Sequence, residues 1–340
     1  MFKLNLFKLS IAFFVLIVLS ENLMAQIKPG EVWNDTEGNP INAHGGGVLF
    51  HDGTYYWYGE IKKGATRRVD YITAWECYRV EAGGVSCYSS TDLINWTNEG
   101  LALSPNYEDS TSDIHPSKVI ERPKVIYNDK TGKYVMWMHI ESEDYSYAQA
   151  GVAVSDSPQG PFTYLGSMRP NNQMSRDMTL FKDDDGKAYH IYSSEFNATM
   201  YISLLSEDYL KPSGTFTRNF IDESREAPAI IKYNNKYFII SSGCTGWSPN
   251  PAIYATADSI LGPWVVAGDP CVNDKKQTTF DSQSTFIIPL KDKPGNFIFM
   301  ADRWNKKNLE DSRYVWLPMQ INDNKVQIEW KDSWNITNKK

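Results

Sequence analysis

Residues 226–241 read EAPAIIKYNNKYFIIS, which is a polar residue, an apolar run, an Asn-Asn turn and an aromatic strand. The same order recurs in four further stretches, which begin at His44, Glu121, Asp177 and Gln283. The five starts lie 49 to 77 residues apart. Internal repeats of about this period indicate an architecture built from equivalent supersecondary units. The second strands of the five units are expected at residues 55–59, 134–139, 188–193, 237–241 and 297–301.

The leading polar residue has a fixed offset from the turn. It precedes Gly53, Gly186 and Asn235 by nine positions in three of the five repeats. If equivalent strands are arranged radially, equivalent residues converge on the axis. The lead residues would then form one small polar site from His44, Glu121, Asp177, Glu226 and Gln283.

A second hairpin follows in each repeat and brings the expected count to four strands. Its loops carry recurring Ser/Ala-Asp and Gly-Pro-aromatic patterns, as in residues 155–162 and 257–264. The strand runs are rich in β-branched and aromatic residues and are bounded by turn residues. No amphipathic helical segment separates them, which disfavours a parallel α/β fold. The fold class predicted is therefore all-β, a five-bladed β-propeller. The long first spacing reflects an insertion at residues 61–84.

Composition narrows the classes of partner. The chain has 340 residues, 11 Trp and 20 Tyr, and a formal net charge of −7. The aromatic content suits strands and also sugar stacking. The negative charge argues against nucleic acid and anionic membranes as partners.

The amino terminus is typical of a targeting segment. Two lysines precede the apolar run 11–19, and small-residue cleavage is available before Gln26. This pattern predicts a secretory signal peptide over residues 1–25 and a single domain over residues 26–340. The protein is expected to be exported, either periplasmic or extracellular, and monomeric. In an oxidising compartment, Cys77, Cys87, Cys244 and Cys271 could pair, with three connectivities open.

Seven stretches resemble glycoside hydrolase family 43, and within it the exo-β-1,3-galactanase subfamily (subfamily 24). They are NAHGGG (42–47), YYWYGE (55–60), ERPKVIYN (121–128), SRDM (175–178), REAPA (225–229), SGCTGW (242–247) and SQST (282–285). The resemblance implies a five-bladed propeller that hydrolyses with inversion. It also implies release of galactose from the β-1,3-galactan backbone of arabinogalactan, which makes a polysaccharide or oligosaccharide the expected partner.

Inverting hydrolysis needs a protonated carboxyl at the leaving oxygen and a base that holds water, about 6.5–9.5 Å apart. Glu226 is the predicted general acid, because the apolar residues after it and a neighbouring carboxylate would raise its pKa. Asp177 resembles the family's pKa-modulating aspartate. Most of the family places the base, an Asp, at the start of the first blade, where this chain has Asn42-Ala-His44. By resemblance Gln283 is the water positioner, while Glu121 is the more ordinary base chemically and resembles the subfamily's substrate-binding glutamate.

Weaker candidates complete the predicted site. The resemblance suggests that the terminal sugar is bound by Glu60, Tyr145, Asn197, Thr245 and Trp247, with His44 either a ligand or a turn residue. No metal ligand set and no cofactor are predicted. The acidic turn 183–186 lacks the downstream Glu of a calcium loop, so a structural calcium ion is not predicted either. Two alternatives stay open: an arabinofuranosidase or xylosidase of the same family, and a non-catalytic glycan-binding propeller.

Overall fold

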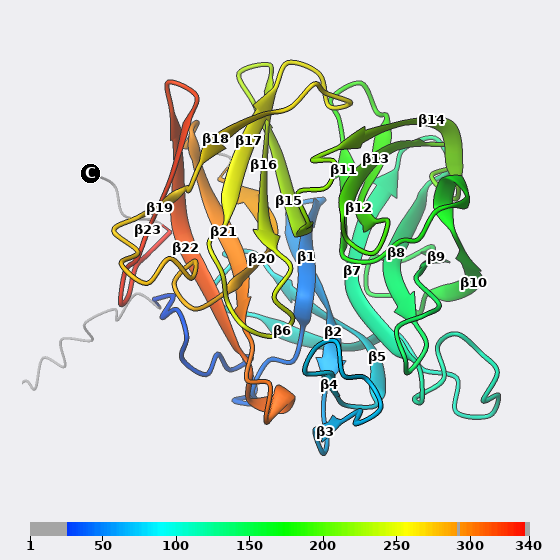
Figure 1. The fold of residues 1–340 in the computed structure, drawn as a ribbon. Coiled ribbons are helices and arrows are strands. Elements are labelled where there is room, and N and C mark those ends of the chain that lie inside the picture. Colours follow the sequence, from blue (N-terminus) through cyan, green and yellow to red (C-terminus); the bar gives the residue numbers. More distant parts are fainter. Residues whose placement is uncertain (1–25, 291–292, 337–340) are drawn as a thin grey trace, which may run out of the picture.

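The structure is a computed structural model that describes residues 26–290 and 293–336. Five sheets, antiparallel except for one short parallel strand, surround a common axis (Figure 1), and the predicted five-bladed all-β propeller is confirmed. Four of these sheets have four strands and one has five. The predicted signal peptide, residues 1–25, lies outside the described residues.

Each blade is built from strands that are nearly consecutive in the chain. Blade 1 contains β1 (His44–His51), β2 (Thr54–Lys62), β5 (Ala82–Ser90) and β6 (Thr97–Leu103). Blade 2 contains β7 (Val119–Asn128), β8 (Lys133–Glu141), β9 (Gln149–Ser155) and β10 (Thr163–Met168). Blade 3 contains β11 (Met178–Lys182), β12 (Ala188–Ser194), β13 (Thr199–Leu205) and β14 (Pro212–Asn219).

The last two blades follow the same plan. Blade 4 contains β15 (Arg225–Tyr233), β16 (Lys236–Gly243), β17 (Ile253–Ala257) and β18 (Val265–Gly268). Blade 5 contains β20 (Gln283–Pro289), β21 (Asn296–Arg303), β22 (Arg313–Asn322) and β23 (Lys325–Glu329), with β19 (Cys271–Val272) added in parallel to β23. The remaining elements are the hairpin β3 (Arg67–Arg68) and β4 (Tyr78–Arg79) and the 3-10 turns η1 (Pro170–Asn172) and η2 (Leu309–Asp311).

The core consists of apolar layers between neighbouring blades. The second strand of each blade is covered on both faces, and the run KYVMWMHIE of β8 is buried at every position after the first. Alternating residues therefore serve two different interfaces. Trp137 of β8, for example, packs toward blade 3 with Leu180 and Tyr192. Burial of such apolar surface is the main favourable term in folding.

Blades 1 and 5 meet at a seam where their strands belong to separate sheets. The seam is an aromatic cluster in which Trp57 and Trp316 lie 4.7 Å apart between ring centroids. The hydroxyl of Tyr314 in blade 5 donates to Ile41 O at 3.0 Å and accepts from Ala43 N at 2.8 Å. Specific side-chain contacts thus close the ring where a shared strand does not.

β-Bulges follow the lead residues of three inner strands. The register shifts between His44 and Gly47, between Glu121 and Lys124, and between Glu226 and Ala229. In each bulge the residue after the lead residue is left-handed: Gly45 (φ 56°), Arg122 (φ 56°) and Ala227 (φ 53°). A bulge bends its strand and re-aims side chains.

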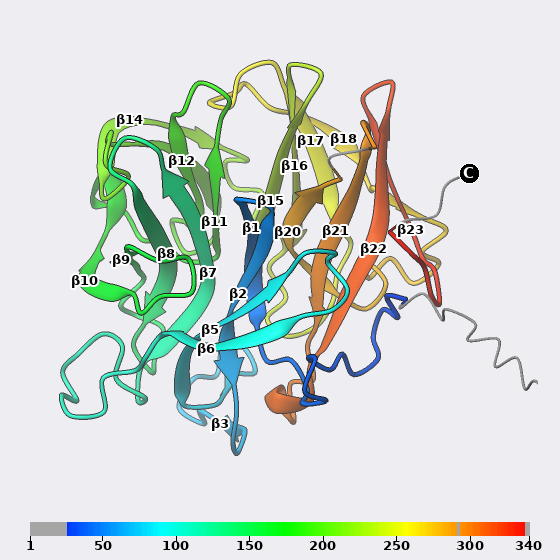
Figure 2. The ribbon, with the colours of Figure 1, turned by 180° about the vertical axis from the view of Figure 1, so that it is seen from behind.

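The connections from second to third strands all emerge on one face. The predicted insertion forms the longest of them, and its hairpin β3–β4 projects from the same face as η2 (Figures 1 and 2). All four cysteines are unpaired, so the suggested disulfides are absent from the structure; Cys77 and Cys87 are buried as thiols. No helix within the described part of the chain is long and apolar enough to cross a membrane.

Candidate active site

A cavity of about 260 Å³ opens on the face that carries these connections. This volume is just below the roughly 300–1,000 Å³ typical of small-molecule pockets, which suits one sugar ring better than a longer chain. Eight of the ten sequence-predicted residues line it: Glu60, Glu121, Tyr145, Asp177, Asn197, Glu226, Trp247 and Gln283. The inner strands supply its floor and the connections supply its rim.

The other two predicted residues lie elsewhere. His44 is 1% exposed; its Nδ1 lies 3.0 Å from Asp302 Oδ1, and its ring stacks on Tyr314. Thr245 is exposed, and its hydroxyl donates to Ser248 O within its own loop. Neither side chain lines the cavity. The geometry gives His44 a structural role at the seam between blades 1 and 5.

Glu226 lies at the start of β15 with its carboxylate buried in the cavity wall. Its Oε1 accepts from Gln283 Nε2 at 3.0 Å, and its Oε2 accepts from Asn197 Nδ2 at 3.1 Å. Burial, reinforced by the negative charge of Asp177, raises the pKa of Glu226 to about 8. A carboxyl that stays protonated at neutral pH is suited to donate a proton.

Glu121 has the opposite electrostatics. Burial alone would raise its pKa, but the positive charges of Lys62 and of the His139 imidazole lower it instead. Lys62 Nζ lies 3.6 Å from Oε1, and the Tyr145 hydroxyl donates to the same oxygen at 2.9 Å. The carboxylate is therefore firmly ionised and makes a poor proton acceptor, but a good acceptor of sugar hydroxyl hydrogen bonds.

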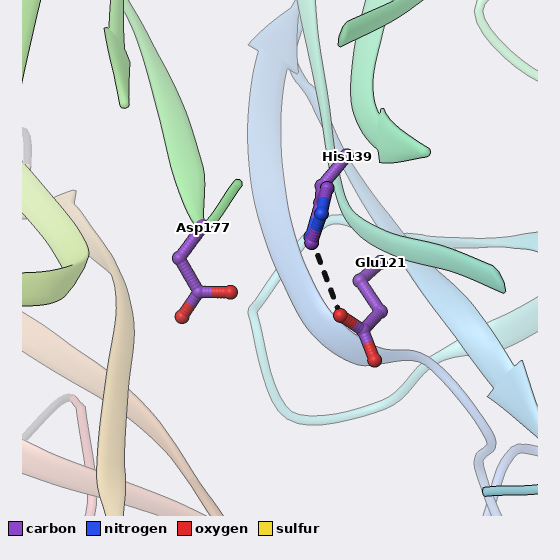
Figure 3. A group of neighbouring side chains, drawn as sticks. All are labelled: Glu121, His139 and Asp177. Carbon is purple, nitrogen blue, oxygen red and sulfur yellow. Dashed lines mark ion pairs between the residues drawn. The ribbon is translucent and has the colours of Figure 1, made fainter. Parts of the chain in front are cut away.

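The imidazole of His139 forms an ion pair with the carboxylate of Glu121 (Figure 3). Its Nδ1 lies 3.3 Å from Glu121 Oε2, and its Nε2 lies 3.4 Å from Glu141 Oε1. Burial would lower the pKa of this imidazole, but the two carboxylates raise it to about 9. A charged His139 holds Glu121 in one orientation.

Gln283 uses the full hydrogen-bonding capacity of its amide. Oε1 accepts from Arg122 Nη2 at 2.6 Å and from Trp304 Nε1 at 3.1 Å. Nε2 donates to Glu226 and to the Ser242 hydroxyl, each at 3.0 Å. Two N–H donors on the oxygen favour the ordinary amide tautomer over an imidic acid.

Arg122 connects residues of blades 3 and 5 at the floor of the cavity. Its guanidinium bonds Asp177 Oδ2 at 2.9 Å in blade 3, and Gln283 Oε1 and Ser284 O in blade 5. Sequence reasoning missed this residue because an alternating strand would point it away from Glu121. The bulge after Glu121 gives Arg122 a left-handed backbone, and both side chains reach the axis.

Aromatic rings from the connections form the rim. Trp247 and Trp304 lie 5.2 Å apart between ring centroids, and Trp75 meets Tyr145 edge-on at 5.2 Å. Trp75, Trp304, Arg176 and His139 were not singled out from the sequence. The only sequence signal for Trp75 and Trp304 was their place in connections equivalent to those of Tyr145 and Trp247.

Glu121, His139 and Asp177 each offer an atom within 4.8 Å of the others, a spacing that a metal ion could use (Figure 3). Their charges are already balanced, because Lys62 pairs with Glu121 and Arg122 pairs with Asp177. Both ring nitrogens of His139 already contact carboxylates, Nδ1 that of Glu121 and Nε2 that of Glu141. The arrangement favours neutral hydroxyl ligands over a cation.

Arg122→Met should lower the free energy of unfolding by about 3–5 kcal/mol, because it leaves the half-buried carboxylate of Asp177 and the buried amide of Gln283 without their partner. Urea-induced unfolding followed by fluorescence measures the change. The matched control is Arg67→Met, whose guanidinium is 47% exposed in its pair with Glu143 and should contribute less than about 1 kcal/mol. Equal losses in the two variants would contradict the role given to Arg122.

Known proteins are similar to this chain in fold and in sequence. A family model for glycosyl hydrolases family 43 matches residues 39–287. A solved GH43 β-1,3-galactosidase with galactodeoxynojirimycin is 45% identical, with a TM-score of 0.84, over 91% of this chain and 100% of that one. An exo-β-1,3-galactanase from Phanerochaete chrysosporium with β-1,3-galactotriose is 38% identical, with a TM-score of 0.83, over 92% of this chain and 68% of that one.

A curated xylan 1,3-β-xylosidase from Vibrio sp. is more distant. It is 23% identical over 197 residues, which is 54% of this chain and only 36% of that relative.

Proposed function

The chain belongs to glycoside hydrolase family 43, and on this premise we propose that it is an inverting exo-β-1,3-galactanase. It would release galactose from the non-reducing end of β-1,3-galactan. The observation that carries the proposal is a cavity with room for one sugar ring, whose wall holds Glu226 with a pKa that burial and Asp177 raise to about 8. An exo-acting enzyme needs such a pocket, because it accepts only the terminal unit.

In the proposed reaction Glu226 protonates the leaving glycosidic oxygen. Burial, with the negative charge of Asp177 beside it, keeps that proton on Glu226 at neutral pH. Glu121, ionised and held by His139 and Tyr145, accepts hydroxyl hydrogen bonds from the terminal sugar. Trp247 offers an apolar face to the C–H groups of the ring.

Gln283 is proposed to position the attacking water. In the unliganded site it contacts Glu226 directly at 3.0 Å, far below the roughly 6.5–9.5 Å separation of an inverting pair. Substrate entry must therefore replace this bond and leave room for sugar and water between the two groups. Arg122 and Trp304 would then keep the amide oxygen in place.

We propose an exported monomer that acts on galactan without a cofactor. The apolar run at residues 11–19, preceded by two lysines, supports export.

Glu226→Gln should reduce turnover of β-1,3-galactan by about 10²–10⁴-fold, because the amide cannot donate the acid's proton. Galactose release measures turnover, and proton NMR of the first wild-type product should show the α-anomer. Unfolding should change little, since the substitution is isosteric. An initial β-anomer, or a Glu226→Gln variant near wild-type rate, would overturn the mechanism.

The rate should fall as pH rises through about 8, because Glu226 works only while protonated and its pKa is about 8. Asp177→Asn should move this alkaline limb of kcat/KM to lower pH, since the neighbouring negative charge disappears. Burial also raises the pKa of Glu60 to about 8, but the charges acting on Glu60 are those of Lys62, Glu121 and Arg122. A limb that Asp177→Asn leaves in place would therefore point to Glu60.

Gln283→Ala should lower turnover at least about 10²-fold while β-1,3-galactobiose still binds, because the variant loses the group that holds the water. Glu121→Gln should instead weaken binding of the disaccharide. Calorimetric binding beside turnover separates the two effects, and azide should rescue only the Gln283 variant. The reverse pattern would make Glu121 the base.

A further inference from the structure

The connection between β12 and β13 has an unusual backbone beside the cavity. Glu195, Phe196 and Asn197 are consecutive left-handed residues, with φ of 52°, 56° and 67°. This conformation is uncommon for residues other than glycine and persists only where the surroundings enforce it. The loop therefore has a fixed shape that places its side chains.

The side chain of Glu195 holds the loop in this conformation. Its carboxylate accepts hydrogen bonds, each of 2.7 Å, from the Thr199 hydroxyl, the Tyr201 hydroxyl and Arg218 Nη2. These partners come from the two outer strands of the same blade, so the loop is anchored away from the cavity.

Asn197 turns inward from this loop toward the acid. Its Nδ2 donates to Glu226 Oε2 at 3.1 Å. Its Oδ1 is buried and has no hydrogen-bond partner among the described residues. A buried acceptor left open beside the acid is placed for a hydroxyl of a sugar at the scissile bond.

Phe196 precedes Asn197 in the same loop but points toward solvent. It is 75% exposed, although it adjoins a residue of the cavity wall. The guanidinium of Arg176, which lines the cavity, lies 6.0 Å from the centre of its ring. Arg176 is itself held by a 2.8 Å bond to Tyr145 O. The ring is thus an exposed aromatic surface that contacts Arg176 of the cavity wall and adjoins Asn197, the residue that contacts the acid.

We infer that Phe196 is the platform for the galactosyl unit on the leaving side of the scissile bond. The inference rests on the proposed function and extends it. Glu226 gives its proton to the oxygen of the leaving sugar, so that sugar lies close to this carboxyl, whose Oε2 accepts from Asn197. A pyranose ring there presents its apolar C–H face to the phenyl ring. The same loop thus places a hydroxyl acceptor and a stacking surface for one sugar.

The test compares two substrates that share the terminal galactose. β-1,3-Galactobiose has a leaving sugar, whereas β-galactosyl fluoride has a leaving group too small to stack. Phe196→Ala should lower kcat/KM for galactobiose about tenfold, which corresponds to about 1.4 kcal/mol, a typical worth of an aromatic contact. Hydrolysis of the fluoride and product inhibition by galactose should stay within about twofold, since neither depends on the platform.

Three further variants separate stacking from loop shape. Phe196→Asn removes the ring but tolerates the left-handed backbone, so it should match Phe196→Ala. Phe196→Trp should retain most of the galactobiose activity. Tyr107→Ala is the control, because it removes an aromatic ring that is 70% exposed and belongs to the connection between blades 1 and 2.

Equal losses on both substrates would mean that the ring only supports the catalytic loop, and that result overturns the inference. Unchanged galactobiose kinetics in Phe196→Ala overturn it as well, while the proposed function stands. A wild-type enzyme that leaves galactobiose intact overturns the proposed function, and the inference falls with it.

Discussion

A single buried guanidinium organises the centre of this propeller. Arg122 leaves blade 2 and bonds groups of blades 3 and 5, so three blades share one side chain at the axis. The same side chain fixes Gln283 and pairs with Asp177, whose charge adds to the effect of burial in raising the pKa of Glu226. Stability of the ring and chemistry of the pocket therefore depend on one buried charge, which is compensated by its pair with Asp177 and its bonds to Gln283 and Ser284.

The local device behind this arrangement is the β-bulge. A regular strand sends neighbouring side chains to opposite faces. The left-handed residue after Glu121 breaks that alternation and brings two adjacent side chains to the axis. The bulge after Glu226 has the same form but carries Ala227, and the bulge after His44 carries Gly45. The three blades thus share one backbone conformation at the bulge but place different side chains there.

The sequence predicted the blades and most of the floor, because both follow from periodicity. Lead residues at a fixed offset from a turn must occupy equivalent places, and Glu121, Asp177, Glu226 and Gln283 do. His44 obeys the same period, yet a buried partner, Asp302, draws it out of the cavity. The position of Arg122 at the axis could not be predicted, because the alternating pattern of a strand does not reveal a bulge. Trp75 and Trp304 lie in connections whose course depends on tertiary contacts such as the pair of Glu76 with Lys306.

The seam between the first and last blades carries a consequence for how the chain can be cut. Ile27 and Trp334 form a two-way bridge, with N–H to O distances of 2.9 and 3.0 Å, so the two ends of the ring lie side by side. Since each blade is made from a nearly continuous stretch of chain, the fold does not depend on which blade is made first. A circularly permuted chain that joins these two ends and opens at the exposed turn near Gly53 would keep all five sheets and the central pocket intact.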